Sequence, residues 1–204
     1  QSLLPGGRRW EVEIGFGKGR FLLATAAERP HDRFVGIEVA SKYFRLAERR
    51  AVRRGLDNVA LVRGEALYLL SAVLPRGFAA AVHVYFPDPW PKDRHHKRRL
   101  FDAETVDLVL GLLAADGVLY VATDHLEYGE EIVALLESHP ALEVTPRDGW
   151  PEGARTNYEI KYEREGRPIV RLEVCVGRPD RGLVHPDGEM RVVTAGGAAG
   201  EAAS

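Results

Sequence analysis

The sequence predicts an α/β fold in which a single doubly wound, mostly parallel sheet ends in an antiparallel edge. Short apolar, β-rich runs alternate with helical patterns along most of the chain, and two further strand-like runs follow near its end. Such alternation produces parallel strands with helices on both faces of the sheet. The length of 204 residues suits one domain with a substantial core, and no internal repeat or linker divides the chain.

The elements follow from apolar periodicity and from turn residues. Strands are predicted at Trp10–Ile14, Arg33–Ile37, Val59–Val62, Ala80–Phe86 and Val118–Ala122. Helices are predicted at Lys18–Glu28, Ser41–Arg54, Leu67–Leu74, Ala103–Leu113 and Leu126–Ser138, the last stopped by Pro140. Turns are predicted at Asp57-Asn58, Pro75-Arg76-Gly77 and Asp116-Gly117. Leu142–Thr145 and Ile169–Val176 predict an antiparallel pair at one edge.

The termini and the single cysteine set the expected boundaries and compartment. Residues 10–179 form the predicted domain, 1–9 a truncated N-terminal segment that begins with Gln1, and 180–204 a largely disordered, Gly/Ala-rich tail. Cys175 alone forms no internal disulfide, and it is expected to be a core residue without chemistry. No apolar stretch reaches the ~18 residues of a membrane span, and no secretion signal opens the chain. We therefore expect a cytoplasmic protein, monomeric or homodimeric.

The formal net charge of −2 conceals two basic runs. Residues 42–54 hold six cations and one acid, and residues 92–99 hold five cations and one acid, with His95 and His96 among them. Charge runs are most often solvated surface, and that interpretation suits the first run better than the second. A polyanion could bind the second run although the whole protein is not basic. Adjacent histidines among cations make a poor metal site, so no metal is expected.

Four carboxylates stand where the first four predicted strands end: Glu13, Glu38, Glu65 and Asp88. Their separations of 25, 27 and 23 residues each correspond to one strand-plus-helix unit. Because the carboxyl ends of parallel strands share one edge of a sheet, this spacing gathers four acids round one cleft, where such sheets bind ligands. An ordinary acid at a helix start explains one or two of them, but explains all four poorly.

A glycine loop follows the first of these acids. Gly15, Gly17 and Gly19 have the spacing G-x-G-x-G, which lets the backbone turn sharply and lets a ligand lie close to it. This spacing is neither the G-x-G-x-x-G of dinucleotide folds nor a phosphate-binding loop. Glu38 is placed to accept hydrogen bonds from ribose hydroxyls, and Glu65 to reach an adenine amino group. A cationic nucleoside without phosphate, such as S-adenosylmethionine, suits these acids.

A proline-rich loop follows the fourth strand, with the sequence Tyr85-Phe86-Pro87-Asp88-Pro89-Trp90-Pro91-Lys92. Alternate prolines predict an extended, stiff loop that holds Asp88 and Trp90 over the cleft. A flat base could stack on the Trp90 indole, although simple packing of the loop onto the domain is about as good an explanation. The basic run that follows directly favours nucleic-acid binding, because phosphate contacts would position a polynucleotide while the loop receives one base.

Together these motifs resemble the bacterial tRNA (guanine-N7)-methyltransferases, which are class I S-adenosylmethionine-dependent enzymes with a Rossmann-like fold. The resemblance runs from about Trp10 to Pro179. It is carried by Glu13–Gly19, Gly36-Ile37-Glu38, Phe86–Trp90, Arg94–Arg99, Ala122-Thr123-Asp124 and Thr156-Asn157-Tyr158-Glu159. The glycine loop is common to many methyltransferases, whereas the Pro-Asp-Pro-Trp loop with its basic continuation and the Thr-Asn-Tyr-Glu motif are much more specific.

The resemblance implies transfer of a methyl group from S-adenosylmethionine to N7 of a guanosine in the tRNA variable loop. It implies Asp88 as the catalytic residue and a cofactor site of Glu13, Gly15, Gly17, Gly19, Glu38, Glu65 and Asp88. The implied substrate-binding residues are Lys92, Asp124, Thr156, Asn157, Tyr158 and Glu159. The implied RNA-binding residues are Arg94, His95, His96, Lys97, Arg98 and Arg99. Two features depart from the family: Glu65 replaces the commoner aspartate, and the segment before the first strand is shorter than usual.

Other interpretations stay open at this stage. Thr156 and Glu159 also form a capping-box pattern that would start a short helix at Tyr158–Tyr162, and Asp124 could be the N-cap of the helix near Leu126. The alternative functions are methylation of an adenine or cytosine amino group in RNA, a nicotinamide-dependent oxidoreductase, and an RNA-binding protein without chemistry. The G-x-G-x-G spacing disfavours the oxidoreductase. The four acids disfavour simple RNA binding, because they repel RNA unless a cationic ligand covers them.

Overall fold

The structure is a computed structural model that describes residues 9–150 and 155–177. Seven strands are described: β1 (Trp10–Ile14), β2 (Arg33–Glu38), β3 (Val59–Arg63), β4 (Ala79–Tyr85), β5 (Leu113–Thr123), β6 (Leu142–Pro146) and β7 (Val170–Val176). The α-helices are α1 (Arg20–Glu28), α2 (Ser41–Arg53), α3 (Ala66–Ala72), α4 (Ala103–Leu112), α5 (Leu126–Glu137) and α6 (Asn157–Arg164). A 3₁₀ segment, η1, spans Asp93–Arg98. Of the predicted terminal segments 1–9 and 180–204, residues 1–8 and 180–204 lie outside the described residues.

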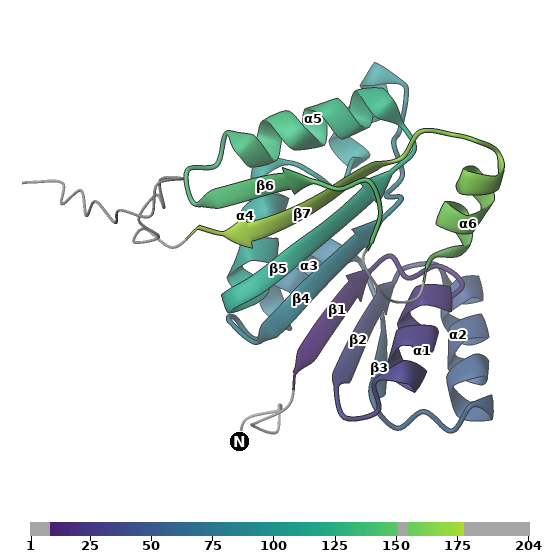
Figure 1. Ribbon diagram of the computed structural model, residues 1–204. Coiled ribbons are helices and arrows are strands. Elements are labelled where there is room, and N and C mark those ends of the chain that lie inside the picture. Colours follow the sequence, from purple (N-terminus) through teal and green to yellow (C-terminus); the bar gives the residue numbers. More distant parts are fainter. Residues whose placement is uncertain (1–8, 151–154, 178–204) are drawn as a thin grey trace, which may run out of the picture.

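The sheet order is β3-β2-β1-β4-β5-β7-β6, as Figure 1 shows. The first five strands of this order pair in parallel, and β7 runs antiparallel to both β5 and β6. The strand order reverses between β1 and β4, which is where open α/β sheets form their ligand crevice. The predicted fold class is therefore confirmed, including the antiparallel edge.

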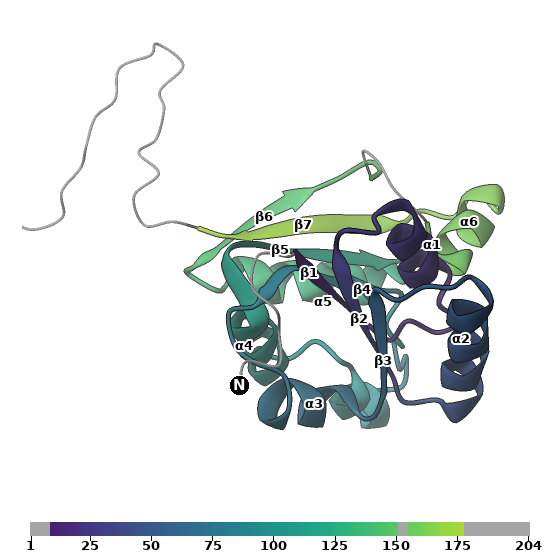
Figure 2. The ribbon, with the colours of Figure 1, turned by 90° about the horizontal axis from the view of Figure 1, so that it is seen from below.

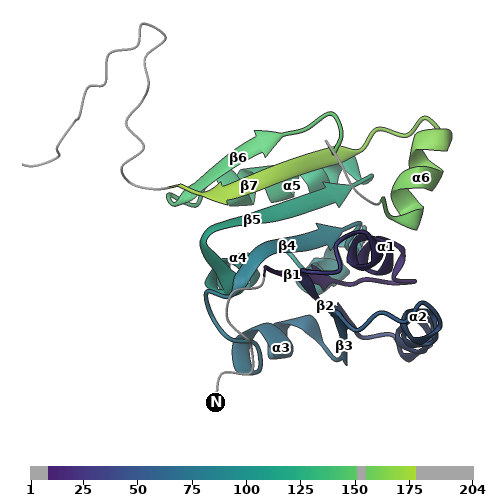
Figure 3. The same cartoon turned by 60° about the horizontal axis from the view of Figure 1, so that its bottom comes forward.

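Helices cover both faces of the sheet, and alternation along the strands separates two cores. Val12, Ile14, Val82 and Val84 point toward α3, α4 and α5 and belong to the larger core. On the opposite face, Phe34 packs with residues of α1 and α2 in a smaller core. Figures 2 and 3 show α1 and α2 on the side of the sheet away from α3 and α4. Two-sided burial explains why β4 is almost continuously apolar, whereas β1 alternates apolar residues with the buried Glu11 and Glu13.

Several boundaries differ from the predicted ones by a residue or two, and two of the differences have a clear physical cause. Helix α1 begins at Arg20 rather than Lys18, because Gly19 has a left-handed φ of 70° and serves as its N-cap. Strand β5 begins at Leu113, so Asp116-Gly117 lies within it and is not a turn. The pairing of β4 with β5 shifts register between Ala79 and Ala81, and this bulge absorbs the predicted turn residues. A Cβ at Gly117 would lie only 2.8 Å from the carbonyl oxygen of Ala79.

Candidate functional site

The four predicted acids follow four neighbouring parallel strands. The strands concerned, β3, β2, β1 and β4, are consecutive in the sheet. Glu38 ends β2, while Glu65 and Asp88 follow β3 and β4 by two and three residues. Glu13 is the penultimate residue of β1 and lies inside the sheet. The topology therefore brings the acids to one edge, but in different environments. Glu13 and Glu38 are buried, whereas Glu65 and Asp88 are exposed.

The glycine loop is fixed to β2 by hydrogen bonds. Gly15, Gly17 and Gly19 all have left-handed φ values, of 74°, 52° and 70°, which residues with a Cβ rarely adopt. The amide of Gly17 donates to Glu38 Oε2 at 2.8 Å, and the amide of Ala40 donates to Glu38 Oε1 at 2.8 Å. Glu38 thus holds the loop open beside the sheet edge. A Cβ at Gly15 or Gly17 would meet nothing within 4 Å, so the loop borders open space.

Glu13 is a buried carboxyl with an unsatisfied oxygen. Glu13 is only 3% exposed, and its Oε2 has no hydrogen-bond partner among the described residues. The pKa of Glu13 is raised to about 8, chiefly by burial. A hydrogen bond with the backbone of Leu22 lowers this pKa in part, and the nearby charge of Glu38 raises it further. The site therefore holds a carboxyl that is mostly protonated at neutral pH unless a positive charge or a hydrogen-bond donor compensates its burial.

The two exposed acids differ in what they contact. Glu65 is the N-cap of α3, where its Oε2 accepts a hydrogen bond from the amide of Tyr68 at 3.0 Å. Asp88 lies in the loop after β4, and its side chain makes no ion pair or hydrogen bond within the described part of the chain. Of the four acids, Asp88 is thus the one most available to an incoming molecule.

The proline-rich loop is less extended than the prolines predict. Phe86 and Trp90 each precede a proline, yet their φ values are 53° and 40°, in the left-handed region. Bulky residues adopt this region only where the surroundings impose it. One constraint is Arg99, whose Nε donates to the carbonyl oxygen of Pro89 at 2.8 Å. The loop is therefore held in shape by contacts rather than by proline geometry alone.

The predicted RNA-binding run divides into exposed and buried members. Arg94 and Arg98 are exposed, as is Lys92, the predicted substrate-binding residue just before the run. The Arg98 guanidinium lies 5.0 Å from the centre of the Trp90 ring. His95 packs edge-on against the same ring at 5.7 Å, so the half-buried indole contacts two side chains of η1. His96 is half-buried, and the side chain of Lys97 is not described.

Arg99 departs from the predicted RNA contact. It is only 8% exposed, it pairs with Glu131 as well as Pro89, and it lies 4.7 Å from the centre of the Tyr128 ring. Its guanidinium is used inside the fold and is not presented to phosphate. The sequence of the basic run does not predict the burial of Arg99, because that burial results from α5 packing against the loop.

The Thr-Asn-Tyr-Glu motif begins α6. Thr156 is the N-cap, and its Oγ1 accepts a hydrogen bond from the amide of Glu159 at 3.0 Å. The reciprocal half of the predicted capping box is replaced by an ion pair, because Glu159 Oε1 accepts from Nε of Arg171 at 2.9 Å. Asn157 and Tyr158 remain exposed, and Tyr158 stacks on Tyr162 with ring centres 5.8 Å apart.

Helix α6 also reaches the loop after β4. The Phe86 ring lies 5.9 Å from Tyr158 and 5.5 Å from Tyr162, measured between ring centres. Figure 1 shows α6 at the end of the sheet toward which β4 and β5 point. The fold therefore joins two motifs that are about 70 residues apart in the sequence.

Asp124 has a partner other than the predicted helix cap. His125 is the N-cap of α5, and its ring accepts from the amide of Tyr128. The carboxylate of Asp124 accepts from Arg167 at 2.9 Å instead. The possibility that Asp124 caps this helix is thus wrong, and its implied role in substrate binding stays a prediction. Cys175, expected in the core, is half-buried in β7.

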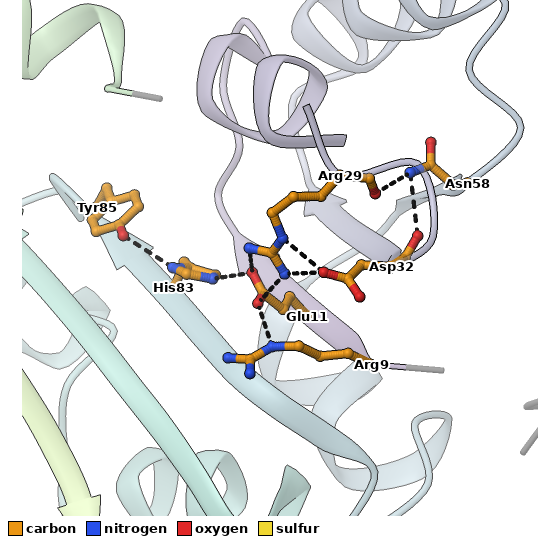
Figure 4. A network of polar contacts seen from close by, with 7 residues as sticks. All are labelled: Arg9, Glu11, Arg29, Asp32, Asn58, His83 and Tyr85. Atoms are coloured by element: carbon orange, nitrogen blue, oxygen red, sulfur yellow. Dashed lines mark hydrogen bonds and ion pairs between the residues drawn. The ribbon is translucent and has the colours of Figure 1, made fainter. Parts of the chain in front are cut away.

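A buried polar network between β1, β4 and the segment before β2 was missed by the sequence analysis (Figure 4). Glu11 on β1 is 2% exposed, and its carboxylate contacts Arg9, Arg29 and His83. His83 also contacts the Tyr85 hydroxyl at 2.9 Å. Burial by itself raises the pKa of Glu11, but the hydrogen bonds and charges of His83 and Arg29 outweigh it and lower that pKa well below its usual range.

Only weak sequence signals pointed to this network. Glu11 and Glu13 alternate along β1, as His83 and Tyr85 do along β4, so both pairs face the same side of the sheet. Tyr85 is largely enclosed, and burial, followed by the charge of Glu13, raises its pKa well above the usual value. The network therefore runs along β1 and β4, from Arg9, Arg29 and Asp32 near the amino-terminal ends of the strands to Tyr85 at the end of β4.

Neither a metal centre nor a membrane span is found in the described part of the chain. Among residues 9–150 and 155–177, no three or more His, Cys, Asp or Glu side chains come together in a way that could hold a metal ion. None of the described helices is both long and apolar enough to cross a bilayer.

The chain is similar to known methyltransferases over most of its length. A family model described as "Putative methyltransferase" matches residues 8–172. A tRNA (guanine-N(7)-)-methyltransferase of Nocardia farcinica is 42% identical over 166 residues, covering 79% of this chain and 60% of the relative. The protein of the same name from Leifsonia xyli is 39% identical, covering 79% and 74%. The chain spans only about 60 to 65% of the first relatives it matches.

Solved structures share the fold at low sequence identity. An rRNA methylase from Streptococcus thermophilus has a TM-score of 0.57 at 11% identity, with 84% of this chain and 88% of that one covered. A SAM-dependent methyltransferase from Aquifex aeolicus has a TM-score of 0.57 at 12% identity, covering 84% and 85%. At such identities the likeness concerns the fold alone. The family match and the relatives at about 40% identity establish more: the chain belongs to the methyltransferase family that includes the tRNA (guanine-N(7)-)-methyltransferases.

Proposed function

We propose that this protein transfers the methyl group of S-adenosylmethionine to N7 of a guanosine in the tRNA variable loop. The observation that carries the proposal is the acidic edge, where the buried carboxyls Glu13 and Glu38 stand beside the glycine loop and near the exposed Asp88. Relatives named for this reaction, at about 40% identity, support the choice of acceptor.

The residues present fit the proposed donor. Glu13 Oε2 is buried without a partner, and a cationic ligand would stabilise its ionised form. The open space beside Gly15 and Gly17 provides room for a nucleoside against the backbone. Glu38, Glu65 and Asp88 complete an edge that favours a positively charged molecule and would repel a phosphate. These residues, with Gly19 closing the loop, would hold the donor.

Catalysis would depend on alignment and on one carboxylate. When bound, S-adenosylmethionine supplies a methyl group on a positively charged sulfur. Guanine N7 has an in-plane lone pair and no proton at neutral pH, so no residue needs to remove one. Asp88, exposed in a shaped loop, favours the positive charge that develops on the purine. The remaining rate enhancement comes from holding both reactants in line.

The acceptor is assigned to the surface that α6 and the proline-rich loop share. Asn157 and Tyr158 are exposed there, and the contacts of Phe86 with Tyr158 and Tyr162 join the two elements. Lys92, Arg94 and Arg98 extend the same loop with exposed cations, which suits phosphates of a bound tRNA. The reaction would take place in the cytoplasm, in keeping with a chain that has one cysteine.

The test is methyl incorporation into unmodified tRNA from labelled S-adenosylmethionine, followed by identification of the nucleoside. The proposal expects 7-methylguanosine. N-methylated adenosine or cytidine would instead support the amino-methyltransferase alternative. Binding of tRNA without methyl incorporation would support an RNA-binding protein that does no chemistry.

A second measurement separates the role of Asp88 from donor binding. Asp88→Asn should lower turnover by about 10²-fold or more, and should change the donor affinity much less. Unchanged turnover in a folded Asp88→Asn protein would remove Asp88 from catalysis.

A further inference from the structure

A basic groove lies between α6 and the pair α1–α2, beside the candidate site. One part, of about 280 Å³, is lined by Arg20, Arg50, Arg53, Arg54 and Asn157 together with Gly19 and Leu23. A second part, of about 700 Å³, is lined by Arg20, Asn157 and the cationic side chains Arg155, Lys161 and Arg164, with Ile160, Glu163 and Glu165. Arg20 and Asn157 belong to both parts, so the two form one groove.

The charge of this groove is strongly positive after internal pairing. Seven cations and two carboxylates line its two parts. Both carboxylates are already paired: Glu163 with Arg155 and Arg171, and Glu165 with Arg167 and Lys161. The side chains of Arg20, Arg53, Arg54 and Arg164 make no ion pair or side-chain hydrogen bond within the described residues. Four guanidinium groups are thus left to bind an anion.

Helix geometry explains why one part of the basic run of α2 reaches this groove. Arg50, Arg53 and Arg54 are spaced i, i+3 and i+4, so they lie on one side of the helix end. Arg50 is anchored there, because its Nη1 donates to the carbonyl oxygen of Lys18 at 2.8 Å. Arg45 and Arg49 are equally exposed but do not line the groove. The basic run at residues 42–54 is therefore only partly a solvated helix face, because three of its arginines line the groove.

We propose that this groove binds the phosphate backbone of the tRNA substrate, as a second anchor separate from the basic run after β4. The proposal rests on the proposed function, and it adds cationic side chains that are not among the candidate site residues, although Gly19 and Asn157 also line the groove. Planar guanidinium groups bind phosphate in bidentate fashion, and several unpaired ones in one groove suit a repeated anion. Asn157 belongs both to the groove and to the motif assigned to the acceptor, so the groove leads away from that motif. Figures 1 and 3 show α6 beside α1 and α2.

The test compares two double variants of the same helix. Arg53→Gln/Arg54→Gln removes two groove cations, and Arg45→Gln/Arg49→Gln removes the same charge from outside the groove. Affinity for an unmodified tRNA transcript is measured by filter binding at several salt concentrations, with S-adenosylmethionine affinity and circular dichroism as folding controls. The groove variant should bind roughly tenfold to fiftyfold more weakly at ~0.1 M salt, and its salt slope should fall by up to about 2. The control variant should change both quantities much less.

Other outcomes would either overturn the groove or separate it from the proposed function. Equal losses in the two double variants would overturn the groove and leave only long-range charge. A wild-type protein that does not bind tRNA would overturn it as well. If wild-type protein binds tRNA but transfers no methyl group, the proposed function fails, and the comparison of the two variants still decides the groove. A third variant, Arg20→Gln, at the junction of the two parts, should also weaken binding.

Discussion

Arg171 on β7 and Glu159 on α6 form an ion pair, Nε to Oε1 at 2.9 Å, in which the two side chains are only 7% and 2% exposed. The same guanidinium contacts Glu163 at 2.9 Å and the carbonyl oxygen of Asp148 at 3.3 Å. Arg171 therefore ties together α6, the segment before it and the antiparallel edge of the sheet. The helix that begins with the Thr-Asn-Tyr-Glu motif is positioned by a residue outside that motif.

Arg171→Met should destabilise the protein by about 3–5 kcal/mol, because it leaves the Glu159 carboxylate buried and unpaired. Denaturant-induced unfolding at pH 7 measures this loss. Arg147→Met is the matched control, since Arg147 pairs with Glu173 at 2.9 Å on the exposed surface, and its loss should be much smaller. Adding Glu159→Leu to Arg171→Met should restore stability but not methyl transfer. If the two single arginine variants were equally stable, the buried pair would have no positioning role.

Glu13→Gln should change how stability depends on pH. The folded protein raises the pKa of Glu13 to about 8 from a usual value of 4.5. Between these values the native state binds more protons than the unfolded state, so wild-type stability falls as pH rises through this window. Glu13→Gln removes the fall, and should be more stable than wild type at pH 8.5 by on the order of 3–5 kcal/mol, and nearly equal to it at pH 4.5.

Denaturation of both proteins at pH 4.5, 6.5 and 8.5 without ligand checks this expectation. A difference that stays constant with pH would show that Glu13 does not titrate in this range. Binding of the cationic donor should also release a proton from wild-type protein at pH 7, which calorimetry in buffers of different ionisation enthalpy detects. Glu13→Gln should bind the donor more weakly and release none.

Glu11→Gln should show the opposite pH dependence. His83 and Arg29 lower the pKa of Glu11 despite its burial, so its ionised form stabilises the fold above about pH 4.5. That contribution is lost as pH falls toward the lowered pKa. At pH 7 the variant should lose roughly 3–5 kcal/mol, and the loss should shrink during acid unfolding. Exposed Glu28→Gln, at the end of α1, is the control and should change little. Equal losses at pH 7 and pH 3 would contradict the ionised network.

Arg99→Gln and Arg94→Gln should separate the two roles within the basic run. Arg99 holds the Pro89 carbonyl and packs on Tyr128, so its loss should lower stability and turnover while the salt slope of tRNA binding stays near the wild-type value. Exposed Arg94 should instead lower that slope by up to about 1, with stability unchanged. Salt titrations of tRNA binding, together with thermal unfolding, distinguish them. A reduced slope in Arg99→Gln would mean that the buried guanidinium reaches phosphate after all.

Local sequence patterns were sufficient to predict most of the strands, the acidic edge and the glycine loop. Apolar periodicity located β1 correctly and β2, β3, β4 and β7 to within a residue or two. The regular spacing of Glu13, Glu38, Glu65 and Asp88 placed four acids at one sheet edge, because parallel strands joined by crossovers must end on the same side. The glycine loop could be predicted from the sequence because glycine adopts the left-handed φ of Gly15 and Gly17 without steric cost, whereas residues with a Cβ rarely do. These features depend on backbone geometry and on strand period, which neighbouring residues determine.

The tertiary structure decided which polar side chains are buried and what each one contacts. Arg98 and Arg99 are neighbours in the sequence, yet Arg98 is exposed and Arg99 is buried. Glu159 belongs to a capping pattern, but Arg171, twelve residues later, takes its carboxylate. The groove likewise exists only because α6 lies beside α1 and α2, elements that more than 100 residues separate. Burial and pairing depend on contacts between distant segments, so no local pattern encodes them, whereas strands, turns and glycine loops are fixed within a few residues.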